Sequence, residues 1–421
     1  FHPAPGITVT FRDAGHVLGS AITEILIEDG GETKKVVFSG DLGNTEIPLM
    51  RDPTVIEGAD LLILESTYGN RRHKDRVDEQ DKVDTFVSLV NQTIRGGGNV
   101  VIPSFAVGRT QEIIYEINRQ IALENDNDPS GKSAERELFL HTPVIVDSPL
   151  AINATEVFRD NEDCFDAEAQ AYIHNKDNLL DFPNLRLTRT ADESKEVNRD
   201  PAPKIIIASS GMCDAGRIRH HLKHNLWRPE STVIFVGYQA PGTLGRQLVD
   251  GDDEVRLFGE DITVRAKIAF IEGYSGHADQ DGLLNWVDAM ANKPAQIVLV
   301  HGEPDAMEDF SATLGERFGI PVQAPDFGES VVFGADVPAR AILKPVPAAT
   351  ETARTGAARE TPATGDLLPR LESLRADFMG VLQHFHDSLR RADSRRERDK
   401  AMARARQWEQ DVRRTLERYR R

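Results

Sequence analysis

The chain has 421 residues, of which 39% are hydrophobic, and a net charge of −18. This length predicts at least two domains, while no apolar run reaches the roughly 18 residues that a membrane span needs. The acidic net charge argues against non-specific binding to nucleic acid. The only two cysteines, Cys164 and Cys213, are far apart in sequence, which argues against a thiolate zinc site and for a reducing, cytoplasmic compartment.

Residues 1–70 have the pattern of short strands joined by tight turns. Strands are expected at 7–11, 21–27, 35–38 and 61–64. The turn residues at 28–31 predict a hairpin between the second and third of these. His16, Asp41 and Glu65 lie where strands end or begin, and α/β enzymes place their chemistry at strand ends.

Residues 71–261 alternate strands with helices. Strands are expected at 99–102, 143–146, 205–208 and 232–235. Helices are expected at about 80–95, 109–124, 149–160, 166–176, 214–225 and 242–249. This alternation predicts a separate domain with a mainly parallel sheet covered by helices. Residues 125–137 are expected to form a polar surface loop.

Residues 262–340 return to the first pattern. Strands are expected at 264–271, 297–300, 321–324 and 330–333, and helices at 279–290 and 304–318. We expect this block and residues 1–70 to form one domain, into which residues 71–261 are inserted.

The C-terminal part changes composition. Residues 341–365 are rich in Pro, Ala and Thr and predict a flexible linker. Residues 366–421 predict a charged, Arg-rich helical tail with an apolar stripe. The tail is either an oligomerisation or docking element, as in a homodimer, or a solvated charged helix.

Three histidines have the setting of metal ligands. His16 and His277 lie among small residues, and His301 follows a buried strand. A single histidine of this kind is usually a loop or core residue, but three of them together with Asp41 and Glu65 favour a metal site. Imidazoles with a shared carboxylate suit Zn²⁺, with Mn²⁺ or Fe as alternatives. Asp41, between two glycines, either bridges two cations or bonds its own turn.

Several motifs occur in a fixed order. Those of the outer blocks are Gly15-His16-Val17-Leu18-Gly19-Ser20-Ala21, Ser39-Gly40-Asp41, Glu65-Ser66-Thr67-Tyr68-Gly69, Tyr274-Ser275-Gly276-His277-Ala278-Asp279 and Val300-His301-Gly302-Glu303. Those of the middle block are Pro103-Ser104-Phe105-Ala106-Val107-Gly108-Arg109, Ser209-Ser210-Gly211-Met212 and Gly237-Tyr238-Gln239-Ala240-Pro241-Gly242-Thr243. Over about residues 7–335, the chain resembles the β-CASP family of metallo-β-lactamase-fold nucleases, which includes the pre-mRNA 3′-end-processing endonuclease and prokaryotic ribonucleases.

The resemblance implies a fold and a chemistry. The fold is α/β: a metallo-β-lactamase αββα domain, incomplete at the N-terminus, with an inserted parallel-sheet β-CASP cap domain and a C-terminal helical tail. The chemistry is hydrolysis of RNA phosphodiester bonds by a hydroxide that two Zn²⁺ ions activate in a complete site, leaving 5′-phosphate and 3′-hydroxyl ends. The expected partner is single-stranded RNA.

The resemblance also assigns residues. His16 matches a ligand of the first zinc, Asp41 the bridging aspartate and His301 a ligand of the second zinc. Glu65 matches the carboxylate that orients His277 near the scissile phosphate, where a charged imidazole could protonate the leaving oxygen. Alternatively, the pair of Glu65 and His277 is a buried hydrogen bond that holds two domains together.

Two groups of residues are candidates for substrate contact. Ser104, Arg109, Ser210 and Thr243 lie in loops that resemble the face of the cap toward the active cleft, and they are expected to bind backbone phosphates. Thr243 alternatively begins a helix. The basic segment 217–224, with Trp227 and Arg228, is either a nucleic-acid surface or an exposed amphipathic helix.

One departure from the family pattern is large. The His-x-His-x-Asp-His metal motif does not occur in the sequence, so the chain supplies three of the expected metal ligands. We expect the chain to be an N-terminally truncated piece that binds zinc weakly and is inactive alone. One alternative is a naturally non-catalytic scaffold subunit. Another is ester or thioester hydrolysis, against which the inserted cap argues.

Overall fold

The computed structural model describes residues 1–72, 79–125, 133–174, 178–271, 274, 276–326, 329–332 and 341–342. These residues belong to one compact unit, which spans Phe1–Val346. The predicted linker, apart from Ala341–Ile342, and the predicted tail lie outside the described residues. No helix in the described ranges is long and apolar enough to span a membrane.

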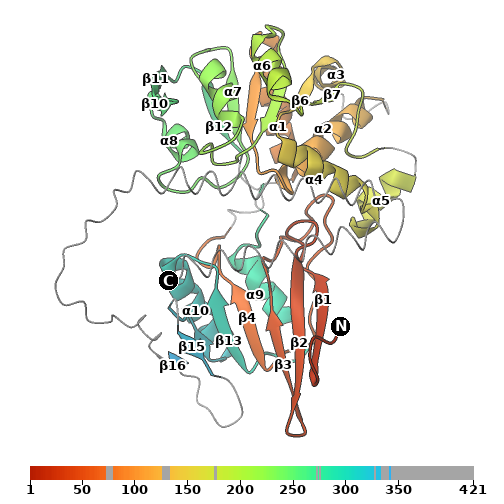
Figure 1. The fold of residues 1–421 in the computed structure, drawn as a ribbon, viewed down its shortest axis with the longest axis vertical. Helices are drawn as coiled ribbons and strands as arrows, with labels where there is room; N and C mark the ends of the chain where they lie inside the picture. The colour runs from red at the N-terminus through yellow and green to blue at the C-terminus, as the bar shows by residue number, and fades with distance from the viewer. Residues whose placement is uncertain are drawn as a thin grey trace, which may run out of the picture. The chain divides into compact units, whose positions relative to one another are not determined.

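Within the described residues, the first sheet has six strands in the order β1-β2-β3-β4-β13-β14 (Figure 1). They are β1 (Ile7–Asp13), β2 (Ala21–Asp29), β3 (Glu32–Phe38), β4 (Leu61–Glu65), β13 (Gln296–Val300) and β14 (Val322–Gln323). The predicted hairpin joins β2 to β3 through Gly30 and Gly31, whose φ angles of 59° and 86° suit glycine. β3, β4 and β13 are parallel neighbours, so strands from both ends of the unit share one sheet.

Alternate residues of the first sheet form two apolar faces. One face is covered by α9 (Gln280–Ala289) and α10 (Pro304–Phe318), which pack against Leu62, Leu64 and Leu299. The opposite face carries a smaller cluster around Val36, Leu61 and Val298, to which no helical residue of the described chain belongs. Phe11 and Phe38 lie on the same face as this smaller cluster, and they are 59% and 40% exposed.

Within the described residues, the second sheet also has six strands, in the order β12-β9-β5-β8-β6-β7, and every recorded pairing is parallel. They are β5 (Val100–Pro103), β6 (Val144–Val146), β7 (Leu185–Leu187), β8 (Ile205–Ala208), β9 (Thr232–Phe235) and β12 (Lys267–Phe270). Its helices are α1 (Glu79–Arg95), α2 (Arg109–Asn125), α3 (Ser133–His141), α4 (Pro149–Arg159), α5 (Ala167–His174), α6 (Ala191–Arg199), α7 (Ile218–Asn225) and α8 (Leu244–Asp250).

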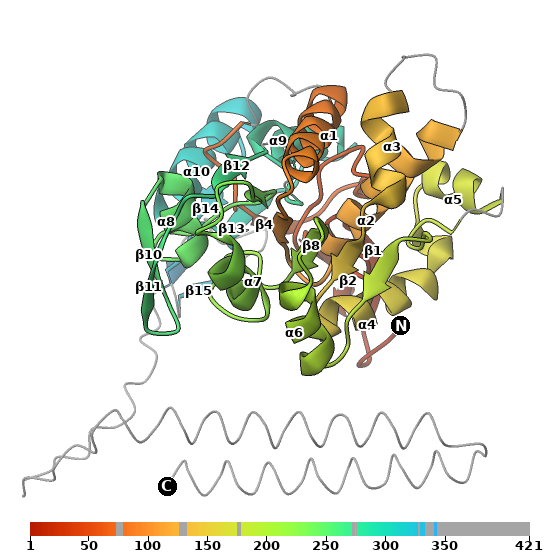
Figure 2. The same ribbon diagram turned by 90° about the horizontal axis from the view of Figure 1, so that it is seen from above.

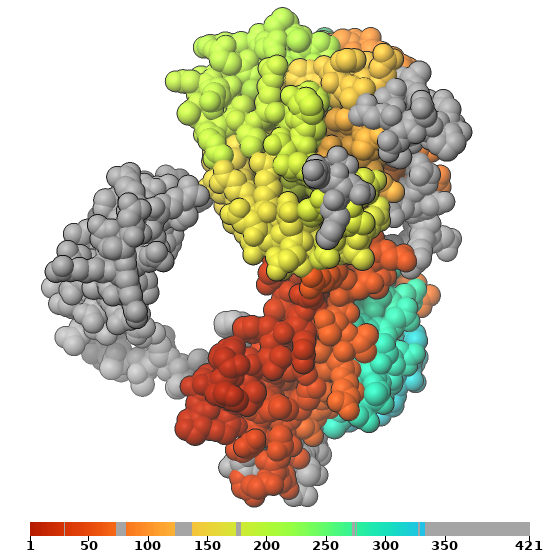
Figure 3. All heavy atoms as spheres, turned by 90° about the vertical axis from the view of Figure 1, so that its right-hand side faces the viewer, coloured from red at the N-terminus to blue at the C-terminus, as the bar shows by residue number. Residues whose placement is uncertain are grey.

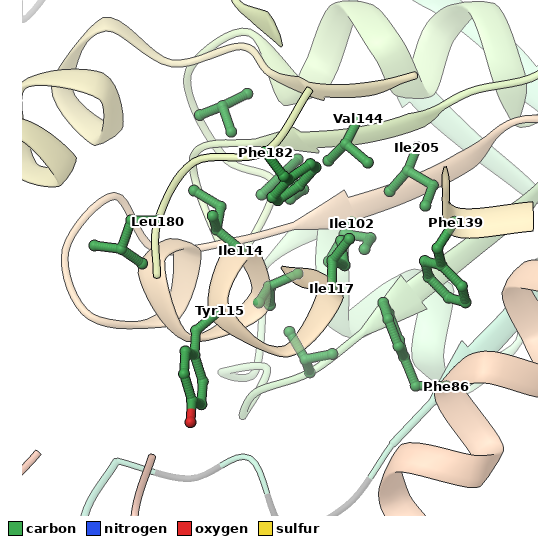
Figure 4. Close-up of a cluster of buried hydrophobic side chains, with 14 of the residues drawn as sticks. Phe86, Ile102, Ile114, Tyr115, Ile117, Phe139, Val144, Leu180, Phe182 and Ile205 are labelled. Carbon is green, nitrogen blue, oxygen red and sulfur yellow. The ribbon is translucent and has the colours of Figure 1, made fainter. Parts of the chain in front are cut away.

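Helices cover both faces of the second sheet, with α7 and α8 on one side and α1, α2 and α3 on the other (Figure 2). Successive residues of β5 point to opposite cores: Val100 and Ile102 join the cluster of α1, α2 and α3, and Val101 joins the cluster of α7 and α8. Figure 4 shows part of the first cluster, in which the rings of Phe86 and Phe139 lie 6.2 Å apart.

Short elements complete the described chain: the 3₁₀ turn η1 (Glu162–Cys164), the hairpin of β10 (Glu254–Leu257) and β11 (Glu260–Thr263), and the pair of β15 (Ser330–Val331) and β16 (Ala341–Ile342). The two sheets meet near Met50, which forms a β-bridge with Phe165. In Figure 3 the red N-terminal part of the chain lies against the yellow part near residues 150–174.

Two predicted elements differ in the structure, and one helix was not predicted. The strand predicted at 264–271 is shorter, and as β12 it pairs with β9 in the second sheet rather than with the outer blocks. The loop predicted at 125–137 is helical from Ser133, because Phe139 packs in the core; residues 126–132 lie outside the described residues. The pattern also missed α6, although its capping box of Thr190 and Glu193 is a sequence signal for a helix start.

Candidate metal centre

The first sheet brings the predicted strand-end residues together. Asp41 follows β3, Glu65 ends β4 and His301 follows β13, and these three strands are parallel neighbours. Parallel neighbours end at the same edge of a sheet. His277 reaches that edge from the segment before α9. One potential ligand atom from each of Asp41, Glu65, His277 and His301 lies within 4.8 Å of the others.

Asp41 and His301 form the more exposed half of this group. His301 Nδ1 lies 3.1 Å from Asp41 Oδ1, and the two side chains are 56% and 41% exposed. His301 has a φ of 53°, which is uncommon for a residue other than glycine and recurs at functional sites. The Thr67 hydroxyl donates to the His301 carbonyl over 3.2 Å, so the strained residue is fixed from the β4 side.

Gly302 has no room for a side chain. A Cβ there would lie 2.7 Å from the backbone oxygen of Ser66. We expect Gly302→Ala to lower the free energy of unfolding by about 1–3 kcal/mol in a urea titration. Gly315→Ala is the control, because open space surrounds this glycine of α10, and alanine there should stabilise by about 0.5–1 kcal/mol. Equal effects of the two substitutions would contradict the close packing at Gly302.

Glu65 and His277 form the buried half of the group. Glu65 is 1% exposed, and His277 Nδ1 donates to its two carboxylate oxygens over 3.2 and 3.1 Å. The carboxylate also accepts from the backbone N–H of Leu42, and the Glu65 N–H donates to Ser39 Oγ over 3.0 Å. Burial alone would lower the pKa of His277, but the hydrogen bond and charge of Glu65, with Asp41, raise it above its ordinary value.

His16 lies beside this group rather than within it. Its ring centre is 4.2 Å from that of His277, and its buried Nδ1 has no hydrogen-bond partner among the described residues. Burial lowers the pKa of His16, although the backbone of Gly276 opposes this. A buried, neutral imidazole with an unpaired nitrogen fits a metal ligand, since ligand histidines are deprotonated. The donor set of imidazoles and carboxylates therefore fits Zn²⁺.

The loops that carry these residues are bonded to one another. The Gly43 N–H donates to the Ala14 carbonyl over 2.8 Å, and the Ala278 N–H donates to the Leu42 carbonyl over 2.8 Å. Backbone hydrogen bonds thus join the loops of His16, Asp41 and His277, which are far apart in sequence.

Comparisons with known proteins agree with this arrangement. Residues 110–248 match the Beta-Casp domain, and residues 261–325 match the Zn-dependent metallo-hydrolase RNA specificity domain. A ribonuclease of Thermus thermophilus is 35% identical over 325 residues, which cover 77% of this chain and 69% of that protein. The chain belongs to the β-CASP family of metallo-β-lactamase-fold ribonucleases.

Further relatives support the same family. The RNase J-like protein of Methanocaldococcus jannaschii is 33% identical, over 76% of this chain and 69% of that protein. The transcription termination factor FttA of Thermococcus kodakarensis is 31% identical, over 77% of this chain and 48% of that protein. The predicted fold class, a metallo-β-lactamase fold with an inserted parallel-sheet β-CASP domain, is confirmed for the described residues.

Ser104, Ser210 and Thr243 lie in loops of the β-CASP block (residues 71–261), and Arg109 begins α2. All four have partners within the protein. Ser104, 1% exposed, accepts from the Thr110 hydroxyl over 3.0 Å. Arg109 pairs with Glu112, Ser210 Oγ donates to the Ala215 carbonyl over 3.3 Å, and Thr243 caps α8. Their binding to phosphate stays a prediction.

The basic segment of the β-CASP block is an amphipathic helix with paired cations. Arg217 donates to Asp147 over 2.6 Å, Lys223 to Glu260 over 2.6 Å, and Arg228 to Glu230 over 2.9 Å. His221 is fully buried, while Trp227 is 54% exposed. Carboxylates of the protein therefore pair with most of these cations, which fits the alternative of an amphipathic helix.

The β-CASP block also contains a buried network that no sequence motif indicated. Asp147 follows β6 and is fully buried. It accepts hydrogen bonds from His221, Ser194, Thr188 and Arg217. The signal that selected Asp41, a carboxylate directly after a buried strand, also applies to Asp147.

Proposed function

We propose that the protein is a metal-dependent RNA-processing nuclease that hydrolyses phosphodiester bonds of single-stranded RNA with two Zn²⁺ ions in the complete site. The convergence of Asp41, Glu65, His277 and His301 within 4.8 Å at one sheet edge carries this proposal. The names of the relatives support it, since two of them are called ribonucleases or RNase-like. The homodimer and the cytoplasmic location stay predictions.

Each residue of the centre has a proposed task. His16, Asp41 and His301 would hold the cations, with Asp41 between them. Bound Zn²⁺ would supply activation of water and neutralise charge on the phosphate. Glu65 accepts the Nδ1 proton of His277, which orients the ring and favours its charged form. His277 then donates a proton from Nε2 to the leaving oxygen.

We further propose that residues outside this chain complete the metal shell, and that the chain alone binds zinc weakly and does not cleave RNA. The absence of His-x-His-x-Asp-His from the sequence supports this. One apolar face of the first sheet supports it too: no helix of the described residues covers this face, and an apolar face is normally buried against a second layer. In the same proposal, residues 1–70 and 262–340 form one domain and 71–261 the cap, except that β12 belongs to the cap sheet.

The alternative is a non-catalytic scaffold with the same fold, which the absent motif favours. Two measurements separate the proposals: the reading frame upstream of Phe1, and cleavage of single-stranded RNA by the complete protein with and without a chelator. We expect an upstream His-x-His-x-Asp-His and cleavage that stops on chelation and returns with Zn²⁺. A complete frame without the motif, or a zinc-loaded complete protein without cleavage, would leave the scaffold.

The proposed role of Asp41 as a metal ligand predicts a loss of metal when its charge is removed. We expect Asp41→Asn to weaken zinc binding by the complete protein at least about a hundredfold, since altering even outer-shell partners costs roughly 10- to 100-fold. A competition titration with a zinc-sensitive dye measures this. Asp52→Asn is the control, because Asp52 is exposed and, in the described part of the chain, accepts from the Glu46 N–H over 2.8 Å. Equal zinc affinity of both variants would remove Asp41 from the ligand set.

A further inference from the structure

Arg71 lies between aromatic rings from two parts of the fold. Its guanidinium carbon is 5.7 Å from the ring centre of Tyr68 and 5.2 Å from that of Tyr238. Tyr68 follows β4, and Tyr238 follows β9 of the second sheet. The residue is therefore placed where a loop of the first sheet faces a loop of the β-CASP block.

This position adjoins the metal centre. Tyr68 also packs edge-on against His277, with ring centres 6.0 Å apart and an angle of 89° between the rings. The Arg71 N–H donates to the Tyr68 carbonyl over 3.0 Å, and the Arg71 carbonyl accepts from the Gln280 N–H over 2.9 Å. Gln280 begins α9, directly after the segment that carries His277. Backbone hydrogen bonds thus tie Arg71 to the start of α9, next to the segment that carries the proposed acid.

A single glycine lets this loop run close to the first sheet's helices. A Cβ on Gly69 would lie 2.7 Å from the Phe310 Cβ and 2.8 Å from the Ala306 carbonyl oxygen, both on α10. The Gly69 carbonyl also accepts from the Gln280 side chain over 2.6 Å. The loop is held on both sides, so the Arg71 backbone is set before any ligand arrives.

The guanidinium of Arg71 forms no ion pair with any described residue. Arg71 is exposed, and no carboxylate of a described residue lies within ion-pair distance of it. Its neighbour Arg72 differs, because its Nε lies 3.3 Å from Asp281 Oδ1. In a chain of net charge −18, an exposed guanidinium without a carboxylate partner is a local attractor for anions.

We propose that Arg71 binds a backbone phosphate of the RNA strand beside the scissile phosphate, and that Tyr68 and Tyr238 are its positioning residues. This inference rests on the proposed function. A guanidinium fork matches the geometry of phosphate oxygens. The aromatic faces restrain the guanidinium without neutralising it, which leaves its N–H groups able to donate to an anion.

The affinity of the full chain for a short fluorescein-labelled single-stranded RNA tests this, measured by anisotropy in a chelator so that metal and cleavage play no part. We expect Arg71→Ala to raise Kd about ten- to hundredfold. The slope of log affinity against log salt should become shallower by about 0.7, the loss of one phosphate contact. Arg72→Ala, which removes the same charge from the adjacent residue, should change Kd by less than about threefold.

Conservative variants separate binding from folding. Arg71→Lys should keep the wild-type salt slope and regain only part of the affinity, because lysine lacks the planar fork. Tyr238→Phe should bind as wild type and Tyr238→Ala more weakly, with thermal unfolding unchanged in both.

The outcomes are distinguishable. Equal Kd values for Arg71→Ala and Arg72→Ala overturn the inference and leave the proposed function intact. A wild-type chain that binds no single-stranded RNA in the chelator overturns the inference and leaves the proposed function to the cleavage test on the complete protein. Loss of affinity in Arg71→Ala, with full cleavage by the complete His277→Ala protein, supports the inference and overturns the assigned acid.

Discussion

The His277→Ala substitution is expected to lower the rate of RNA cleavage by the complete protein about 10²- to 10⁴-fold, the usual contribution of a general acid. His277 is the candidate because Glu65, 1% exposed, accepts from its Nδ1 over 3.1 Å and raises its pKa. Single-turnover cleavage of a labelled single-stranded RNA measures the rate, with zinc content determined on the same samples.

Zinc content decides between two roles of His277, because one of its nitrogens also belongs to the group of potential ligands. If His277 is only the acid, the His277→Ala variant keeps its zinc. If His277 is also a metal ligand, the zinc content of the variant falls. Glu65→Gln should reduce the rate with zinc retained, since it keeps the shape of the side chain and removes its charge. His2→Ala is the control for loss of an exposed histidine. Cleavage by His277→Ala at the wild-type rate would show that another group protonates the leaving oxygen.

The second large effect concerns stability. Asp147→Ala is expected to lower the free energy of unfolding by about 3–5 kcal/mol, the cost of breaking a buried ion pair from one side. Asp147 is fully buried, and its loss leaves Arg217 and the buried His221 without their carboxylate. Urea unfolding followed by circular dichroism measures this. Asp160→Ala, at an exposed aspartate after α4, should change stability by less than about 0.5 kcal/mol.

The same residue predicts a dependence on pH. Burial alone would raise the pKa of Asp147, but hydrogen bonds from His221, Ser194 and Thr188 hold it well below the usual range. A depressed carboxyl pKa stabilises the folded state above the ordinary value of about 3.9, and this contribution is lost as pH falls through the depressed value. The difference in free energy of unfolding between wild type and Asp147→Asn should therefore be largest near neutral pH and become smaller below about pH 4. A difference that stays constant across this range would mean that Asp147 acts through packing alone.

Local sequence was sufficient for many elements. Buried apolar runs and flanking glycines predicted β3 and β4, and the same signals marked Asp41 and Glu65 at their ends. The alternation of runs and amphipathic segments predicted the parallel second sheet. These features follow from periodicity and turn chemistry, which neighbouring residues set. Pattern and motif together therefore determined the fold class and the candidate residues of the metal centre.

Tertiary structure alone decided the partners. β12 pairs with β9 in the second sheet, although its sequence position predicted that it would belong to the outer blocks. Strand pairing depends on faces and edges that distant segments supply. The tertiary structure also placed His16 beside the four converging side chains. It paired Arg217 with the buried Asp147 and placed Arg71 between Tyr68 and Tyr238. The sequence determined which side chains carry charge. Only the folded chain decided which charges neutralise one another and which remain for a metal or an RNA phosphate, since that depends on distances between residues far apart in sequence.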